Sequence, residues 1–291
     1  MRFLFVDRIL ELTPGQMTRG VKQVTNNDFY LTRAKDGRSC FIPSLIGETL
    51  GQLAAWNVMY SNDFTARPVA GIVSSAHLLR PVYVGETLLL ESVIDAWDET
   101  SVRYHSHAYV DDEEVFRIDS ALGPMLPMAD FIDDATIRNQ FFEIHSQSSS
   151  DENLTPKENN TLTSIYFPMS FDRVLDLKPG VEMVAEMYVN PTAPYFPDHF
   201  PKKPVLPMTV LLESKLNMAN EFIQQSAFDK AYLVREMRKI KMNEFVVPGD
   251  RLLSHLMVKH QADDEITLGF RSEVNGKRVC VLEVVMTAKD L

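Results

Sequence analysis

"VDRILELTPG" (residues 6–15) and "FDRVLDLKPG" (residues 171–180) are two copies of one segment. They share Asp, Arg, Leu, Leu, Pro and Gly at the same spacing, with an offset of 165 residues counted from residue 6 to residue 171. Applied without gaps, this offset places Glu48 on Glu213. An internal repeat indicates the overall architecture more strongly than any local sequence pattern does. We therefore expect the chain to contain two copies of one fold.

A later pair of segments supports the duplication. "VYVGETL" (residues 82–88) matches "VVPGDRL" (residues 246–252) at almost the same offset. This predicts an N-terminal domain at residues 1–125, a linker at residues 126–164 and a C-terminal domain at residues 165–291. The linker contains a run of Ser, Asn, Asp and Glu with few apolar residues, which is typical of flexible connections. Before that run, "MADFIDDATIRNQFFEI" is a candidate short helix that bridges or covers the two units.

Each copy has the same coarse pattern of an opening strand, a loop, an apolar helix and several strands. The helices are expected at residues 44–61 and 209–226, with Ser44 and Thr209 as N-cap residues whose hydroxyl groups accept a free amide. Alternating apolar runs follow, with turn signals such as "NG", and indicate antiparallel hairpins. The sequence predicts an α+β fold with a long central helix wrapped by an antiparallel sheet in each copy.

Composition narrows the class of protein. The 291 residues are 45% hydrophobic and carry a net charge of −11, so nucleic-acid binding is disfavoured. Cys40 and Cys280 are too few for a disulfide framework and are expected to be free thiols. Asp7 and Arg8 interrupt the apolar N-terminal run, and no apolar stretch approaches the length of a membrane span. We expect a soluble, cytoplasmic protein.

The segments "FDRVLDLKPG", "HFPKKPVLPMTVLLES", "VVPGDRLL" and "VNGKRVCVLEVVM" resemble the successive signatures of bacterial 3-hydroxyacyl-[acyl-carrier-protein] dehydratases, which have the hot dog fold. The resemblance covers nearly all of both copies. It is more specific in the second copy, where His199, a proline-rich turn and Glu213, fourteen residues after the histidine, all coincide. The resemblance implies a fused double hot dog with pseudo-twofold pairing of its two units.

In that family each site takes its histidine from one hot dog unit and its carboxylate from the other. At the repeat offset the position equivalent to His199 is Ala34, so the first copy has no catalytic histidine. The resemblance therefore implies one composite site, with His199 and Glu48 as catalytic residues. Glu213 would face Ala34 and is expected to be a relic.

The implied reaction converts (3R)-3-hydroxyacyl-acyl-carrier-protein to trans-2-enoyl-acyl-carrier-protein. A neutral His199 would take the proton from C2. Glu48, in the apolar segment "LIGETLGQLAAW", would have a raised pKa and protonate the leaving hydroxyl group. Gln52, one helical turn later, would support Glu48. The backbone amides of Met208 and Thr209, at a helix N-terminus, are candidate donors to the thioester oxygen.

Four positions depart from the family pattern. Lys202 and Met208 stand where the family has glycines, Pro43 is the counterpart of Met208 in the first copy, and Asn217 replaces a glutamine. These departures keep other functions open. The chain is alternatively a non-catalytic acyl-carrier-protein-binding protein, a hot dog thioesterase or an enoyl-CoA hydratase. Carrier protein and coenzyme A are not distinguished as the group that holds the acyl chain.

Acyl carrier proteins are acidic, so a partner of this acidic chain needs local positive charge. The candidate carrier-protein contacts are Lys202, Lys203, Arg238, Lys239 and Lys241. No cofactor is expected beyond the phosphopantetheine arm that carries the substrate. "HSH" at His105 and His107 has no third ligand nearby, so no metal site is expected. The pseudo-dimer is a candidate unit of a larger homo-oligomer.

Overall fold

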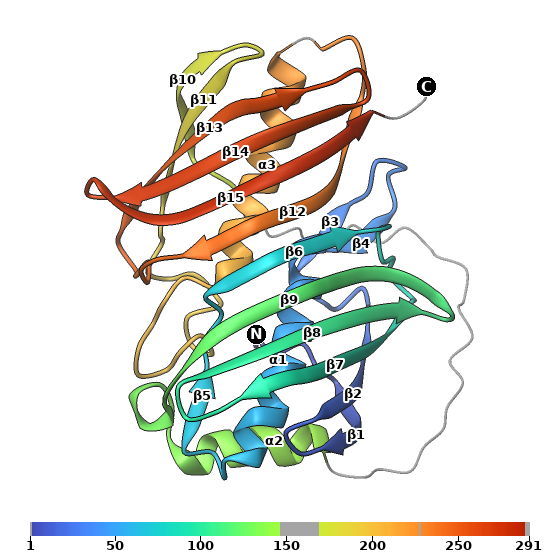
Figure 1. Ribbon diagram of the computed structural model, residues 1–291, viewed down its shortest axis with the longest axis vertical. Coiled ribbons are helices and arrows are strands. Elements are labelled where there is room, and N and C mark those ends of the chain that lie inside the picture. The colour runs from blue at the N-terminus through green and yellow to red at the C-terminus, as the bar shows by residue number, and fades with distance from the viewer. Residues whose placement is uncertain (1, 146–168, 227, 289–291) are drawn as a thin grey trace.

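The computed structural model describes residues 2–145, 169–226 and 228–288, and shows two α+β units joined edge to edge (Figure 1). Residues 146–164 of the expected linker lie outside the described residues. The described part of that segment contains the short 3-10 helix η1 (Met128–Asp130) and the helix α2 (Asp134–His145). Helix α2 therefore overlaps the stretch that was a candidate helix (residues 128–144) and extends one residue beyond it, and it packs beside β1 of the first unit.

The first unit contains one long helix and nine strands. Its elements are β1 (Arg8–Thr13), β2 (Met17–Gln23), β3 (Leu31–Arg33), β4 (Ser39–Phe41), α1 (Pro43–Ser61), β5 (Ala66–Pro68), β6 (Ile72–Leu78), β7 (Thr87–Trp97), β8 (Ser101–Val110) and β9 (Glu113–Pro127). The second unit's elements are β10 (Arg173–Lys178), β11 (Glu182–Tyr188), α3 (Met208–Gln225), β12 (Tyr232–Met242), β13 (Arg251–Gln261), β14 (Glu265–Val274) and β15 (Lys277–Ala288).

One continuous antiparallel sheet runs through both units in the order β1-β2-β7-β8-β9-β6-β12-β15-β14-β13-β11-β10. The order reads equivalently from either end, and the two halves meet where β6 pairs with β12. Even the irregularities repeat, because β1 has a register shift between Ile9 and Glu11 and β10 has one between Val174 and Asp176. This symmetry confirms the predicted double hot dog.

The repeated "PG" segments form the turns that lead from β1 to β2 and from β10 to β11. Gly15 and Gly180 both adopt a left-handed backbone, with φ of 70° and 72°, which glycine reaches without steric cost. The amide of Gly15 donates to Oδ1 of the buried Asn57 on α1 at 2.7 Å, and the amide of Gly180 donates to Oγ of Ser226 at 2.9 Å. The stretch that identifies the repeat thus attaches each sheet edge to its central helix.

The two central helices lie behind their own halves of the sheet (Figure 1). Their N-caps differ from the prediction, because Ile42 precedes α1 and Pro207 precedes α3. Pro43 opens α1, where its fixed φ is already helical and its missing N–H costs nothing. Ser44 and Thr209 therefore lie inside the first turn, and neither helix has a side-chain cap. The N-cap assignment was wrong, and the Thr209 hydroxyl has another partner.

The core of the second unit contains one unusual side chain. Lys215 on α3 is 2% exposed, and its Nζ donates to Oγ of Ser254. The repeat offset places it on Leu50 of α1, an ordinary core residue.

No helix among the described residues is long and apolar enough to cross a membrane.

Candidate active site

Each of the two central helices carries a glutamate whose carboxylate contacts the N-terminus of the other helix. Thr209 Oγ1, in the first turn of α3, donates to Glu48 Oε2 on α1 at 2.6 Å. In the symmetric contact the amide of Ser44, in the first turn of α1, donates to Glu213 Oε2 on α3 at 3.3 Å. The repeat offset relates both pairs. Each carboxylate therefore lies against the N-terminus of the other unit's helix, where the helix dipole favours negative charge.

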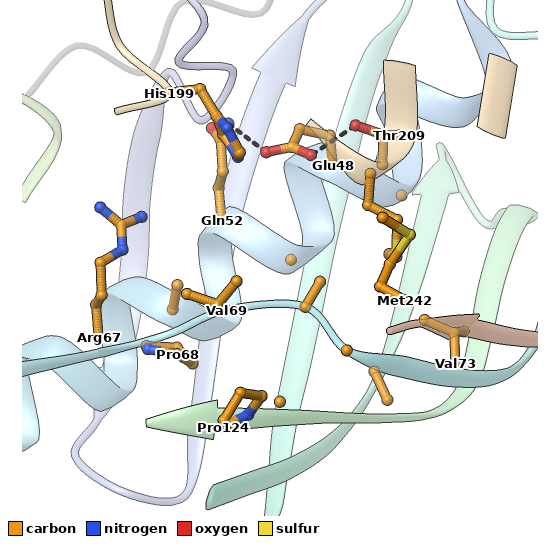
Figure 2. A pocket seen from close by; sticks show the side chains of 18 of the residues that line it. Glu48, Gln52, Arg67, Pro68, Val69, Val73, Pro124, His199, Thr209 and Met242 are labelled. Atoms are coloured by element: carbon orange, nitrogen blue, oxygen red, sulfur yellow. Dashed lines mark hydrogen bonds between the residues drawn. The ribbon is translucent and has the colours of Figure 1, made fainter. Parts of the chain in front are cut away.

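His199 lies beside Glu48, although the two come from different units (Figure 2). The loop between β11 and α3 carries His199, and its Nδ1 contacts the carbonyl oxygen of Val205 at 3.0 Å. A carbonyl oxygen only accepts, so Nδ1 carries the proton and Nε2 keeps its lone pair. Burial lowers the pKa of His199, while the nearby Glu48 charge acts in the opposite direction. A neutral imidazole with a free Nε2 can serve as a base.

Gln52 holds Glu48 from one helical turn away. Its Nε2 donates to Glu48 Oε1 and to the carbonyl oxygen of Phe3, both at 3.1 Å, and its Oε1 accepts the amide of Phe5 at 2.9 Å. Together with the Thr209 contact, both carboxyl oxygens of Glu48 therefore have a fixed donor. The structure thus places Gln52 where it can orient Glu48.

The N-terminal segment takes part in the site, although no sequence pattern predicted this. The ring of Phe3 packs edge-on against the imidazole of His199, with centroids 5.9 Å apart. The amide of Phe3 also donates to Oδ2 of Asp198 at 2.6 Å. The opening residues of the first unit therefore close over the histidine loop of the second.

A cavity of about 670 Å³ contains His199 and Glu48 and is lined by both units. Beyond these polar groups its wall is mainly apolar and follows one face of α1 toward α2. This part of the wall includes Trp56, Met59, Phe116, Ile118, Ile132 and Ile137. A mainly apolar cavity with a few convergent polar groups is the usual form of a small-molecule site. Its lining suits an acyl chain.

Met208 and Thr209, the candidate oxyanion donors, are the first two residues of α3 and both line this cavity. The first amides of a helix have no acceptor within the helix, so these two are free to meet an external oxygen. The helix dipole adds to that preference. Their role as oxyanion donors remains a prediction.

Glu213 lies in a second cavity, of about 610 Å³. Among the described residues that line it are Lys35 and Asn217, and no histidine. The place of the histidine loop is taken here by the β3–β4 hairpin, with Ala34 in its turn. Burial raises the pKa of Glu213, with the Ser44 contact acting against it. The structure thus separates Glu213 from His199.

Two of the candidate carrier contacts lie on the loop after His199. Lys202 Nζ forms an ion pair with Asp133 at 2.5 Å. Lys203 Nζ lies 5.3 Å from the ring centroid of Phe131 and 5.0 Å from that of Phe245. Lys203 is exposed and has no ion pair among the described residues, so it is the freer of the two cations.

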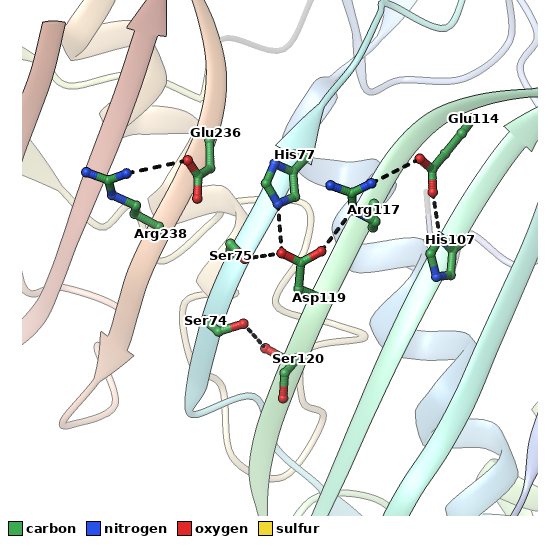
Figure 3. Close-up of polar contacts among 10 residues, drawn as sticks. All are labelled: Ser74, Ser75, His77, His107, Glu114, Arg117, Asp119, Ser120, Glu236 and Arg238. Carbon is green, nitrogen blue, oxygen red and sulfur yellow. Dashed lines mark hydrogen bonds and ion pairs between the residues drawn. The ribbon is translucent and has the colours of Figure 1, made fainter.

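The other three candidate contacts lie on β12. Arg238 and Lys239 contact Glu283 at 3.0 and 3.1 Å on the outer face of the sheet, and Arg238 also contacts Glu236 at 3.7 Å (Figure 3). Lys259 also contacts Glu283, at 3.4 Å, so these cations share one carboxylate and their charges are compensated in part. Lys241 is exposed and lines the first cavity. The structure leaves Lys241 as the member of this group best placed to meet a partner at the cavity.

The paired histidines of "HSH" also lie on this outer face. His105 Nδ1 contacts Asp95 at 2.8 Å, and His107 Nδ1 contacts Glu114 at 2.5 Å. Each imidazole therefore has its own carboxylate partner on a neighbouring strand. In the part of the chain that the structure describes, no three His, Cys, Asp or Glu side chains are arranged to hold a metal ion.

Known proteins match this chain in both sequence and fold. Residues 177–282 match the model of the ApeI-like family, described as ApeI dehydratase. The 3-hydroxyacyl-[acyl-carrier-protein] dehydratase FabZ of Lactiplantibacillus plantarum is 30% identical over 122 residues, which cover 40% of this chain and 82% of the relative. The chain belongs to the FabZ-like dehydratase family. FabZ of Shewanella woodyi is 29% identical over 125 residues, covering 41% of this chain and 82% of the relative.

The match to a FabZ dehydratase extends over less than half of this chain, as expected where two FabZ-like units are fused. A solved structure covers the whole arrangement. A putative oleoyl thioesterase from Lactobacillus plantarum has a TM-score of 0.60 at 11% identity, covering 96% of this chain and 100% of that one. At this identity the likeness concerns the fold alone, and it confirms the double hot dog.

Proposed function

We propose that this FabZ-like protein dehydrates (3R)-3-hydroxyacyl-acyl-carrier-protein to trans-2-enoyl-acyl-carrier-protein at one composite site. The observation that carries the proposal is the meeting of His199 from one unit with Glu48 from the other in a mainly apolar cavity. The second cavity has the equivalent carboxylate, Glu213, without a histidine among its described lining residues.

The proposed elimination begins when His199 Nε2 takes a proton from C2 of the acyl thioester. The electron pair moves toward the thioester oxygen, where the amides of Met208 and Thr209 offset the developing charge. The pair then forms the C2–C3 double bond as the C3–O bond breaks. Glu48 supplies the proton with which the hydroxyl group leaves as water. Proton transfer from His199 back to Glu48 restores the resting state.

The carrier protein would dock where the cavity meets the surface. Lys241 lines the cavity, and Lys203 Nζ lies 5.0 Å from the ring centroid of Phe245, which also lines it. Both lysines are exposed without an ion pair among the described residues, and they fit an acidic partner. The substrate's phosphopantetheine arm would carry the acyl group inward. Apart from this arm, the proposed reaction uses only side chains and backbone amides of this chain.

The test is direct conversion of a (3R)-3-hydroxyacyl-acyl-carrier-protein, followed by mass spectrometry of the carrier-bound acyl group. Loss of one water from the acyl group is the expected result. Release of free carrier thiol would point instead to a thioesterase, and turnover of the coenzyme A ester alone would point to a hydratase. If the carrier protein binds but none of its acyl groups, tested over several chain lengths, is converted, the function is carrier binding without catalysis.

The Thr209–Glu48 hydrogen bond gives a sharper prediction. Thr209→Val removes the hydroxyl donor while keeping the shape of the side chain, and Thr209→Ser keeps the donor. In the proposed mechanism Glu48 is protonated when it meets the substrate, so this hydrogen bond joins neutral groups and contributes about 0.5–1.5 kcal/mol. We therefore expect kcat/KM to fall by roughly two- to tenfold in the valine variant and to stay near wild type in the serine variant. Equal activity in both variants would show that this contact does not position Glu48.

A further inference from the structure

Arg67 is a cation in the wall of the active-site cavity, and it forms no ion pair with any of the described residues. It belongs to β5, and its guanidinium lies over the ring of Phe200, with Cζ 3.7 Å from the ring centroid, and 5.5 Å from that of Phe131. Its Nε is buried without a hydrogen-bond partner, and no described residue forms an ion pair with it. Buried polar groups are nearly always satisfied, so this exception needs an explanation.

The guanidinium lies near the reacting groups. Figure 2 shows Arg67 on the same side of the cavity as Gln52 and His199. Burial lowers the pKa of Arg67 to about 9, with the Glu48 charge acting against this, and the Arg67 charge in turn helps to lower the pKa of His199. Arg67 therefore stays charged near neutral pH, and it acts electrostatically on both members of the proposed pair.

A purely hydrocarbon acyl chain would suit the part of the wall at Arg67 badly, in contrast to the apolar part that follows α1. In the open cavity, water can solvate the terminal N–H donors of the guanidinium, although its Nε–H is already buried. An acyl chain that fills the cavity expels that water, and a charge left without partners in an apolar site is costly. The substrate must therefore bring its own acceptor to Arg67. A planar guanidinium held on an aromatic face is suited to bidentate contact with a carboxylate or phosphate.

We propose that Arg67, braced on Phe200, binds an anionic oxygen group of the thioester substrate. This inference rests on the proposed dehydratase function and adds a substrate class to it. A carboxylate on the acyl group and the phosphate of the phosphopantetheine arm share the required chemistry. The position of Arg67 favours the acyl carboxylate, because it lies beside the groups that face C2 and C3, while the phosphate is separated from the sulfur by the whole pantetheine arm.

The experiment compares matched substrates that differ in one anionic group. One series contains 3-hydroxyacyl thioesters of N-acetylcysteamine, which lack phosphate, in pairs of equal length that end in a methyl group or a carboxylate. The second contains methyl-ended acyl groups on pantetheine with and without its terminal phosphate. The ratio of kcat/KM within each pair isolates anion recognition, because a general effect on His199 changes both members equally.

The variants are Arg67→Met, which keeps an apolar stem over Phe200, and Arg67→Lys, which keeps the charge without the planar fork. Arg138→Met is the matched control, because Arg138 also lies over a phenylalanine ring, 4.9 Å from the centroid of Phe64, and does not line the cavity. Wild type should prefer the carboxylate-ended ester. The preference should fall by about 10- to 100-fold in Arg67→Met, less in Arg67→Lys, and not in Arg138→Met.

A response confined to the phosphate pair would support the subsite and assign it to the carrier arm. If wild type shows no preference in either pair, or if Arg67→Met keeps the wild-type preference, the inference is overturned. If Arg67→Met fails to fold, the inference is still tested by the substrate preference of wild type and by its change in Arg67→Lys.

If wild type dehydrates neither these thioesters nor the carrier-bound substrate, the proposed function fails. In that case, and also where only the carrier-bound substrate reacts, the subsite is tested by binding. Calorimetry with a carboxylate-ended thioester that lacks the 3-hydroxyl group then compares wild type with Arg67→Met. Weaker binding by the variant supports the subsite, and equal binding overturns it.

Discussion

His199→Ala is expected to lower kcat/KM for enoyl formation by about 1,000-fold, because a positioned general base contributes roughly 10²–10⁴-fold. Glu48→Gln should cause a loss of similar size, since the amide has no proton suited to the leaving hydroxyl group. Glu213→Gln should leave the rate unchanged, because Glu213 lies in the cavity without a described histidine. The measurement is conversion of 3-hydroxyacyl-carrier-protein by each variant, after circular dichroism has shown a folded protein.

Glu213→Gln is the matched control for Glu48→Gln, since the two positions are related by the internal repeat and both contact the N-terminus of the other unit's helix. Inactivation by Glu213→Gln, with Glu48→Gln still active, would assign the reaction to the other cavity. Loss of activity in both would indicate that the two cavities depend on each other.

The pH dependence follows from the environment of His199. Its pKa lies below the ordinary value of 6.5, mainly because of burial, and the base form is needed for proton removal. The acid limb of the wild-type profile of kcat/KM should therefore lie below pH 6.5. A limb at or above the ordinary histidine value would show that another group titrates, or that burial does not govern His199.

Much of this site was predictable because the repeat offset identifies the equivalent positions in the two copies. It paired Glu48 with Glu213 and His199 with Ala34, and the resemblance to the dehydratase family implied that the histidine of one unit meets the carboxylate of the other. The outcome is visible in the symmetric contacts of Thr209 and Ser44. Hydrophobic patterning was sufficient for the sheets, since burial alternates along strands such as β7 and β11.

Other features depend on contacts that no local pattern encodes. Phe3 reaches His199 across almost two hundred residues, and "TARPVA" gives no reason to place Arg67 in a cavity. Arg238 looked like a free cation in "REMRKIK", yet its partner Glu283 lies on the next strand of the sheet. Both predicted N-cap residues lie inside the first turn, because α1 opens at Pro43, whose fixed φ suits the first helical position, and α3 opens at Met208, directly after Pro207.

Lys215→Met is expected to stabilise the protein at pH 7 by about 3 kcal/mol. The ammonium group of Lys215 is buried in the core of the second unit, where the repeat has Leu50 in the first unit. Burial lowers its pKa from 10.5 to about 8, and a tenfold change in a proton's binding constant corresponds to about 1.4 kcal/mol. Methionine has a similar length and no charge, so it removes the desolvation cost and fills the same space.

The sign of the pH effect gives a second readout. Below pH 8 both folded and unfolded chains hold the proton, so the folded state carries the full cost of the buried charge. Between pH 8 and 10.5 the unfolded chain binds the proton more strongly, so wild-type stability rises with pH. The advantage of Lys215→Met in urea unfolding should therefore be largest at pH 7 and shrink as the pH approaches 10.5.

Lys22→Met is the matched control for this prediction. Lys22 is also buried, at 5% exposed, but its Nζ contacts Asp28 at 2.8 Å. Removing one partner of a buried ion pair leaves the other charge uncompensated, so this variant should destabilise the protein. Destabilisation by Lys215→Met at pH 7 would mean that the hydrogen bond to Ser254 outweighs the cost of burying the ammonium group. In the variant Ser254 still has the hydroxyl of Ser272, 3.2 Å away, as a partner, so the loss of the lysine contact leaves no unsatisfied hydroxyl group and the removal of the buried charge should dominate.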